Sequence, residues 1–381
     1  MKHKYTFAAL AAFAFMFASQ ALATLPAPTS ATFAKGAKFT VAGYTNATGT
    51  ARSELSNFPV LVRVATNSPS GFQYSEMQHA DATDKNDIDI AFVDMSGKGL
   101  PFEIDTWDTN STSLIWVTLP TMTNGTEFVM CWGSASSGKI VCDDNPWTDY
   151  AGVWHMNDPG NGVTNVCDST DNHLDGTTVS SSTSKTDGKI GGARFITSNA
   201  SNAANNPYDS GITVNLASDT KKKAVVDGLV PEFTVSMWIR PQNTSGKSQY
   251  NYLVARRGAD KGEGWGAQFD ADDNKFSPLR MYAAKETDDH KDNRGDPANK
   301  KVVTAAVSGI KYKEWHKVDL VWTAAAKYVI YVDGEQKATD DLTRDVASNG
   351  DVVNLSLGGS LAPVKSADKS GRGFYGDMDE F

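Results

Sequence analysis

The chain has 381 residues, of which 40% are hydrophobic and 21% are charged. This composition is typical of a globular protein, and the length is sufficient for two domains. The formal net charge is −9, which argues against nucleic-acid binding, because that function needs cations to neutralise phosphates.

The N-terminus has the pattern of a secretory signal peptide. A basic segment, Lys2-His3-Lys4, precedes an apolar segment at 7–17 and the cleavage pattern Ala21-Leu22-Ala23. We therefore expect residues 1–23 to be a signal peptide and the protein to be exported to the periplasm, the cell surface or the medium. The alternative is a retained membrane anchor, but the apolar segment is short for a bilayer span. No membrane span is expected in the mature chain.

Short segments with strand character follow, separated by turns rich in Gly, Asn, Asp and Ser. Their spacing predicts an antiparallel β-sandwich over residues 24–145. The segments are 58–64, 87–93, 100–107, 113–119 and 127–132.

Several phrases in this half resemble a bacterial family, domain of unknown function 2341. Members of that family commonly precede a laminin-G-like jelly roll in secreted or surface proteins, and the resemblance implies no established chemistry. The phrases are Asn57-Phe58-Pro59-Val60-Leu61-Val62, Asp87-Ile88-Asp89-Ile90-Ala91-Phe92, Leu100-Pro101-Phe102-Glu103-Ile104-Asp105-Thr106-Trp107-Asp108 and Ile115-Trp116-Val117.

The chain contains three cysteines, Cys131, Cys142 and Cys167. Export permits a disulfide, and an odd number leaves one thiol over. We expect Cys142 to pair with Cys167, because both lie in irregular segments around the domain junction. Cys131 lies in a strand-like segment and is expected to be a buried apolar residue. The other two pairings stay open.

A β-hairpin is predicted in residues 314–334. Val318, Leu320 and Trp322 recur with period two, and the β-branched and aromatic segment 328–332 ends in the turn dipeptide Asp333-Gly334. Large aromatic residues supply the area for a core. We expect three tryptophans in that core: Trp238, Trp315 and Trp322.

This hairpin and further phrases resemble the concanavalin A-like jelly roll in its laminin-G-like bacterial form. The further phrases are Gly152-Val153-Trp154-His155, Phe233-Thr234-Val235-Ser236-Met237-Trp238, Leu357-Gly358-Gly359-Ser360 and Gly376-Asp377-Met378-Asp379-Glu380-Phe381. The resemblance implies a jelly roll over 150–381, and hence an all-β chain of two antiparallel β-sandwich domains. Family members normally continue past the Asp-Glu pair, which leaves open that the last strand is truncated and the sequence is a fragment. The polar segments 197–225 and 284–304 are expected to be surface loops.

One calcium site is expected in the loop that opens the second domain. Asp168, Asp171 and Asn172 crowd oxygen donors into a short turn-prone segment, as Ca²⁺ prefers. The resemblance implies that an acid of the closing strand, Asp379 here, completes such a site. The alternative is that these residues only form a turn with their own backbone.

A sugar-binding platform is the second candidate site. Tyr250, Tyr252, Trp265 and Tyr282 are aromatic residues in or beside expected loops, and Arg256 lies near them. Aromatic ring faces stack on pyranose rings, so this group would bind a glycan or another surface ligand. The alternative is that each ring packs in the core.

Catalysis is not expected. Glu103, Asp105 and Asp108 resemble the acidic strand of retaining glucanases, but the last residue is Asp where that motif has Glu. Strand alternation would place Glu103 and Asp105 on one face about 7 Å apart, whereas Asp108 would need a bulge to join them. His155 and His316 each follow a tryptophan in a strand and are expected to pack or to bond between strands.

The sequence therefore predicts an exported, non-catalytic protein that binds a glycan or a surface ligand. Two alternatives stay open: a structural or adhesive fragment of a larger surface protein, and a glycoside hydrolase of the jelly-roll glucanase type. The sequence sets no oligomeric state.

Overall fold

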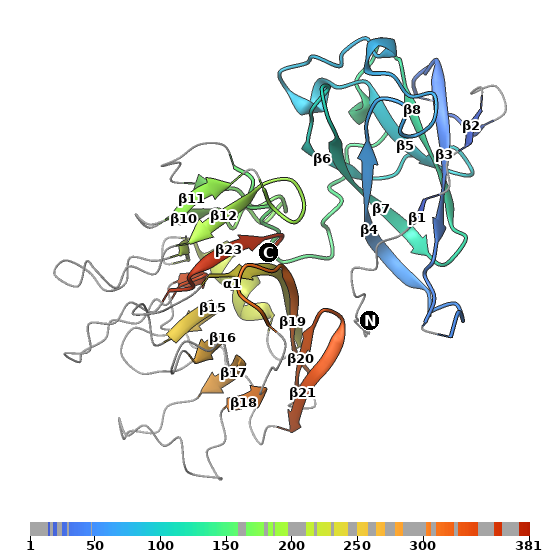
Figure 1. The fold of residues 1–381 in the computed structure, drawn as a ribbon. Coiled ribbons are helices and arrows are strands. Elements are labelled where there is room, and N and C mark those ends of the chain that lie inside the picture. The colour runs from blue at the N-terminus through green and yellow to red at the C-terminus, as the bar shows by residue number, and fades with distance from the viewer. Residues whose placement is uncertain are drawn as a thin grey trace. The chain divides into compact units, whose positions relative to one another are not determined.

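A computed structural model describes residues 14–15, 18–20, 25–28, 30–46, 48–158, 165–178, 182–185, 187–196, 211–216, 219–229, 232–242, 250–257, 264–270, 279–284, 302–305, 310–323, 327–341, 354–359 and 373–381. Contacts divide the chain into two compact units, Met1–Asp149 and Tyr150–Phe381 (Figure 1). Both units are antiparallel β structures, as the sequence predicts. Among the described residues, no helix is long and apolar enough to cross a bilayer.

The N-terminal unit contains two antiparallel sheets. One has the strand order β1-β3-β8-β5, with β2 also pairing with β3, and the other has the order β4-β7-β6. The strands are β1 (Ala14–Phe15), β2 (Ala18–Gln20), β3 (Lys35–Ala42), β4 (Leu55–Val64), β5 (Ile90–Asp94), β6 (Phe102–Thr106), β7 (Ser113–Met122) and β8 (Glu127–Trp132). The 3₁₀ turns are η2 (Tyr74–Glu76), η3 (Lys85–Asp87) and η4 (Gly138–Ile140). The short strands β1 and β2 lie in the expected signal peptide, which stays a prediction.

The core of this unit lies between its two sheets. Alternate residues of β4 point inward, so Val60, Val62 and Val64 are buried and the exposed Arg63 lies between two of them. Phe39 and Phe128 face each other from paired strands, with ring centroids 5.1 Å apart. Each such side chain stabilises the fold by roughly 1.5–3 kcal/mol on burial.

The strand predicted from residue 87 begins later than expected. Residues 85–87 form η3, and β5 starts at Ile90. The reason is Asp89, whose buried carboxylate accepts backbone N–H bonds from Gln78, His79 and Ser134 at 2.8–3.0 Å. This buried carboxylate connects its own segment to the loops at residues 78–79 and 134. The acid–apolar alternation of residues 87–93 therefore does not reflect a strand with one solvated face.

The C-terminal unit is a sandwich of a larger and a smaller sheet. The larger has the order β18-β17-β16-β15-β22-β13-β10-β9, and the smaller has the order β11-β12-β23-β14-β19-β20-β21 (Figure 1). The strands of the larger sheet are β9 (Asn165–Val166), β10 (Gly176–Thr178), β13 (Ile212–Asn215), β15 (Tyr250–Arg257), β16 (Gly264–Asp270), β17 (Leu279–Ala284), β18 (Val302–Ala305) and β22 (Asn354–Leu357). Those of the smaller sheet are β11 (Ser182–Lys185), β12 (Ala193–Ile196), β14 (Phe233–Pro241), β19 (His316–Trp322), β20 (Lys327–Val332), β21 (Glu335–Asp341) and β23 (Gly376–Asp379).

One α-helix interrupts the β structure of the described residues. Helix α1 (Thr220–Gly228) begins at Asp219, whose carboxylate accepts the N–H groups of Lys221 and Lys222 as an N-cap. The helix and β13 occupy part of the segment 197–225, which the sequence analysis expected to be a surface loop. That expectation is wrong there, because Ile212 and Val214 are buried in the core.

The predicted hairpin of residues 314–334 is confirmed. Strands β19 and β20 pair in antiparallel register, with Leu320 opposite Ile330, and both side chains are buried. Asp333 and Gly334 close the hairpin with φ values of 53° and 78°, the positive values that a tight two-residue turn requires. Trp322 stacks on Phe233 with ring centroids 4.4 Å apart, so its predicted place in the core is also confirmed.

Candidate functional site

Three of the five residues that the sequence analysis selected for a sugar platform are buried. Trp265 is 3% exposed and packs in the core against Phe233, with ring centroids 4.6 Å apart. Alternation along β16 explains this, because Trp265, Ala267 and Phe269 share the core face. Tyr252 and Arg256 are also buried. The side chains of Tyr250 and Tyr282 lie outside what the structure describes.

Asp168 acts as a turn former in this structure. Its carboxylate accepts the backbone N–H groups of Val153, Thr170 and Leu174, and also the hydroxyl of Thr170, at 2.7–3.0 Å. Four donors thus converge on its two oxygens, which is the arrangement of an Asp-stabilised loop. Burial is the main cause that raises the pKa of Asp168, and these hydrogen bonds oppose the rise.

The other residues of the expected calcium site contact different partners. The Asn172 amide nitrogen donates to the carbonyl of Ala151 at 3.0 Å, and one oxygen of Asp379 accepts the N–H groups of Lys189 and Ile190. Among the described residues, Asp168, Asp171 and Asp379 do not bring their ligand atoms together as a cluster. These contacts favour the turn-forming alternative, and the calcium site stays a prediction.

The three cysteines are free thiols in this structure. The expected Cys142–Cys167 disulfide is therefore not formed in it, and the two residues belong to different units. The Cys142 sulfur lies 3.7 Å from a carboxylate oxygen of Asp144. Burial raises the pKa of Cys131 to about 12, in agreement with its predicted role as a buried apolar residue.

The glucanase-like motif on β6 lacks the predicted alternation. Ile104 pairs with Ile115 and Thr106 with Leu114, so Asp105 is the extra residue of a β-bulge. Glu103 and Asp105 consequently do not keep the regular spacing of one strand face. The Glu103 carboxylate accepts the indole N–H of Trp147.

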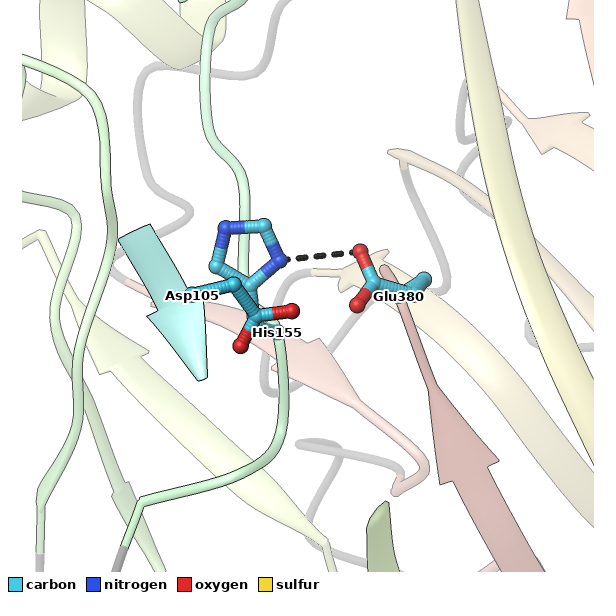
Figure 2. A group of neighbouring side chains, drawn as sticks. All are labelled: Asp105, His155 and Glu380. Atoms are coloured by element: carbon cyan, nitrogen blue, oxygen red, sulfur yellow. Dashed lines mark hydrogen bonds and ion pairs between the residues drawn. The ribbon is translucent and has the colours of Figure 1, made fainter. Parts of the chain in front are cut away.

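The two histidines that were expected to pack or to bond between strands bond within the C-terminal unit, although His155 lies outside the strands that the structure describes. His316 Nδ1 lies 2.8 Å from a carboxylate oxygen of Asp333, and its Nε2 accepts the backbone N–H of Lys311 at 3.0 Å. His155 Nδ1 lies 2.9 Å from Glu380 Oε2 (Figure 2). This contact joins the segment before β9 to the residue that follows β23.

A group of side chains that the sequence analysis did not select crosses the outer face of the smaller sheet, the face turned away from the core. Phe195 of β12 is paired with Asp377 of β23, and Asp377 is paired with Arg240 of β14. Trp315 precedes β19 and lies beside Arg240, because the next pair in the register is Ile239 with His316. We call these four residues the Arg240 row.

The orientation of the row follows from strand alternation. Ile239 and Met378 point into the core, so their neighbours Arg240 and Asp377 point outward. The Arg240 Nε donates to Asp377 Oδ2 at 2.9 Å, and its Nη2 donates to Asp187 Oδ2 at 2.8 Å.

Rings flank this ion pair at both ends. The Arg240 guanidinium lies over the ring of Trp315, 4.8 Å from its centroid. At the other end Phe195 meets Tyr375 edge to face, with centroids 5.6 Å apart. Trp315, Phe195 and Tyr375 are all partly exposed, and Asp187 is exposed. The row thus presents rings and hydrogen-bonding groups to solvent on one face.

The carboxylates around Arg240 stabilise the charged form of its guanidinium. Burial opposes the charge of Arg240, but the hydrogen bonds and charges of Asp377 and Asp187 outweigh this and raise the pKa of the guanidinium. An arginine has five N–H donors, and the bonds to Asp377 and Asp187 use only part of that capacity. Arg240 can therefore donate to a further oxygen while it remains bonded to the two carboxylates.

Trp315, which was expected in the core, lies on this outer face instead. Trp238 is buried, as expected, but it is buried on the outer face and not in the cluster between the two sheets. Trp315 is partly exposed, and Trp238 carries Lys189 over its ring at 4.7 Å from the centroid. Strand alternation could have predicted the outer face for Trp238, since its neighbours Met237 and Ile239 both point into the core. Trp315 precedes its strand, so no alternation assigns it to a face.

Comparison with known protein families gives one match, which lies in the C-terminal unit. Residues 213–381 match the model of the family described as the Concanavalin A-like lectin/glucanases superfamily. This agrees with the jelly roll that the sequence predicts. A comparison with curated proteins finds no match.

Several solved structures are similar to the chain at low identity. The binding domain of Paraclostridial Mosquitocidal Protein 1 is 13% identical with a TM-score of 0.38, and the match covers 58% of this chain and 46% of that one. Domain 4 of AbnA, an extracellular arabinanase from Geobacillus stearothermophilus, in complex with arabinotriose, is 17% identical with a TM-score of 0.34, covering 60% and 89%. The Ruminococcus gnavus IT-sialidase CBM40 bound to alpha2,3 sialyllactose is 15% identical with a TM-score of 0.32, covering 45% and 85%.

The chain thus spans less than half the length of the first of these structures. At such low identities and TM-scores, these similarities imply no ligand for this chain.

Proposed function

We propose that this chain is a non-catalytic glycan-binding protein and that its C-terminal unit binds saccharide at the Arg240 row. The proposal is carried by two aromatic rings that flank a carboxylate and a guanidinium across four neighbouring positions of one sheet face. The match of this unit to the lectin and glucanase superfamily supports the same ligand class.

The chemistry of the row suits a pyranose. A sugar ring has apolar C–H faces, which pack on aromatic rings such as Trp315 and Phe195, and hydroxyl groups at its edge, which need donors and acceptors together. Arg240 supplies donors, and the exposed Asp187 carboxylate supplies acceptor oxygens. Bonds to charged groups are stronger than those between neutral partners.

The row is also ordered before any ligand binds. Arg240 is fixed between Asp377 and Asp187, and it lies over the ring of Trp315. The entropy of ordering these side chains is therefore already lost in the free protein, which favours affinity.

The non-catalytic part of the proposal rests on the N-terminal unit. The bulge at Asp105 breaks the regular alternation that the glucanase-like motif would need. We also propose that the protein is exported, and the leader-like residues 1–23 support this.

A glycan array tests the proposal with the full chain. We expect one saccharide class to bind the wild type and to lose binding to Trp315→Ala. The matched control is Tyr331→Ala, since Tyr331 is a partly exposed aromatic residue of β20 outside the row. The proposal fails if no glycan binds, and that result would favour the structural or adhesive alternative. It fails equally if Trp315→Ala binds as the wild type does.

A further inference from the structure

The N-terminal unit contains a cavity that the superfamily match does not reach. Its volume is about 1000 Å³, and it lies between β6, η3, the loop at residues 79–84 and η4. This volume is at the upper end of the range for small-molecule sites, ~300–1,000 Å³. All the residues that line the cavity belong to the N-terminal unit, so it is complete within that unit.

One wall of the cavity is a free sheet edge. In the described part of the chain β6 pairs with β7 on one side only, so its other edge has no strand partner. Two lysines cover that edge. Lys139 Nζ donates to the carbonyl of Phe102 at 3.2 Å, and Lys85 Nζ donates to the carbonyl of Asp105. Lysine is a common means of protecting an exposed sheet edge.

These bonds also place ammonium donors at the cavity wall. Both Lys85 and Lys139 line the cavity. Each ammonium can donate three hydrogen bonds. Lys139 is held further by the ring of Phe102, whose centroid lies 5.1 Å from its Nζ. The donors are therefore oriented by the protein.

Acceptors line the same cavity. Asp84, Asp87 and Glu103 carry carboxylates, and the carboxylate of Glu103 is oriented by the indole N–H of Trp147. The lining thus contains three carboxylates and two ammonium groups, which leaves a net charge of −1 with histidine counted as neutral. The charges almost cancel, so the cavity does not select a strongly charged ligand such as a phosphate ester.

A ligand that suits this lining must be almost neutral and must donate and accept hydrogen bonds at neighbouring atoms. It must also have apolar faces, because apolar residues, the partly exposed Ala82 among them, line the cavity as well. Hydroxyl groups each donate and accept, and saccharides carry them on adjacent carbons next to C–H faces. We propose that this cavity is a second saccharide site, specific for a short neutral oligosaccharide. The proposal does not depend on the Arg240 row.

The experiment uses the full chain and a panel of neutral trisaccharides, namely maltotriose, cellotriose and xylotriose. Binding is followed by saturation-transfer NMR and calorimetric titration. The blocking variant is Asp87→Arg, which places a long side chain in the cavity. Its matched control is Asp81→Arg, because Asp81 is exposed in the neighbouring loop at residues 79–84 and does not line the cavity, while the change of charge is the same.

We expect one trisaccharide of the panel to bind the wild type and Asp81→Arg alike, and to bind Asp87→Arg about 10-fold more weakly or worse. Glu103→Gln should also reduce the affinity, since it replaces a charged acceptor of the cavity by a neutral one. The local structure should persist, because the amide oxygen can still accept the indole N–H of Trp147. Thermal melts of each variant check that the fold is retained.

Trp315→Ala separates this site from the Arg240 row. Binding of the trisaccharide should persist in that variant, so failure of the row would leave the cavity site intact. The proposal is overturned if no trisaccharide of the panel binds, if Asp87→Arg binds as tightly as Asp81→Arg, or if Trp315→Ala abolishes all trisaccharide binding.

Discussion

The guanidinium of Arg240 lies 4.8 Å from the centroid of the Trp315 ring, on the sheet face turned away from the core. The two residues are far apart in sequence and come together because β14 and β19 are neighbours. Asp377 holds Arg240 from the other side at 2.9 Å. The indole ring is therefore oriented by an ion pair on the adjacent strands.

Replacement of Arg240 by methionine should destabilise the C-terminal unit. The change leaves the carboxylate of Asp377, whose side chain is 3% exposed, without its cation. We expect a loss of about 2 kcal/mol in the free energy of unfolding, measured by urea denaturation. Lys311→Met is the control, since Lys311 is 68% exposed and forms a surface pair with Glu314. Equal stability of the two variants would show that the Asp377 pair contributes nothing.

Replacement of Trp265 by alanine should affect stability before it affects binding. Trp265 packs against Phe233 and Trp322 in the core. Loss of a large buried aromatic side chain costs about 3–5 kcal/mol, because a cavity remains. The thermal midpoint of the variant should fall accordingly. A variant with an unchanged midpoint and weakened glycan binding would restore Trp265 as a ligand residue.

Asp168→Asn distinguishes a turn former from a calcium ligand. The asparagine loses acceptor capacity toward the donors that meet Asp168, so we expect a loss of about 1–3 kcal/mol. The fall in melting temperature should be the same with Ca²⁺ and with a chelator. A wild-type midpoint that rises with Ca²⁺, together with a variant that ignores Ca²⁺, would establish the metal site.

Thiol titration decides the state of the cysteines. The structure predicts three free thiols after unfolding under non-reducing conditions. In the native protein Cys131 should be inert, because burial raises its pKa to about 12. Burial, followed by the nearby Asp158, also raises the pKa of Cys167 to about 11, so its thiolate is scarce at neutral pH and reaction should be slow. One thiol per unfolded chain would instead establish a disulfide, and alkylation with peptide mapping would show whether it joins Cys142 and Cys167.

The architecture could be predicted from the sequence because sandwich strands bury one face. The period-two pattern of Val318, Leu320 and Trp322 marks β19, and Asp333-Gly334 marks the turn that follows β20. Such local patterns need no knowledge of distant strands.

The candidate site could not be predicted in the same way. Phe195, Arg240, Trp315 and Asp377 belong to four separate segments, and only the pairing of β12, β23, β14 and β19 aligns them. The local sequence pattern of one strand does not show which residues of the other strands lie beside it. The bulge at Asp105 shows the same limit, since one extra residue changes the face on which later side chains lie.

A saccharide bound at the Arg240 row should contact Trp315. Its indole N–H resonance can be assigned in a ¹⁵N-labelled full-length chain by its absence from the spectrum of Trp315→Phe, and then followed while a saccharide that binds on the array is titrated. We predict a saturable shift of this resonance at the concentrations that saturate binding, with the indole of the core residue Trp322 unaffected. A Trp315 resonance that stays fixed while the saccharide binds would contradict the proposed site.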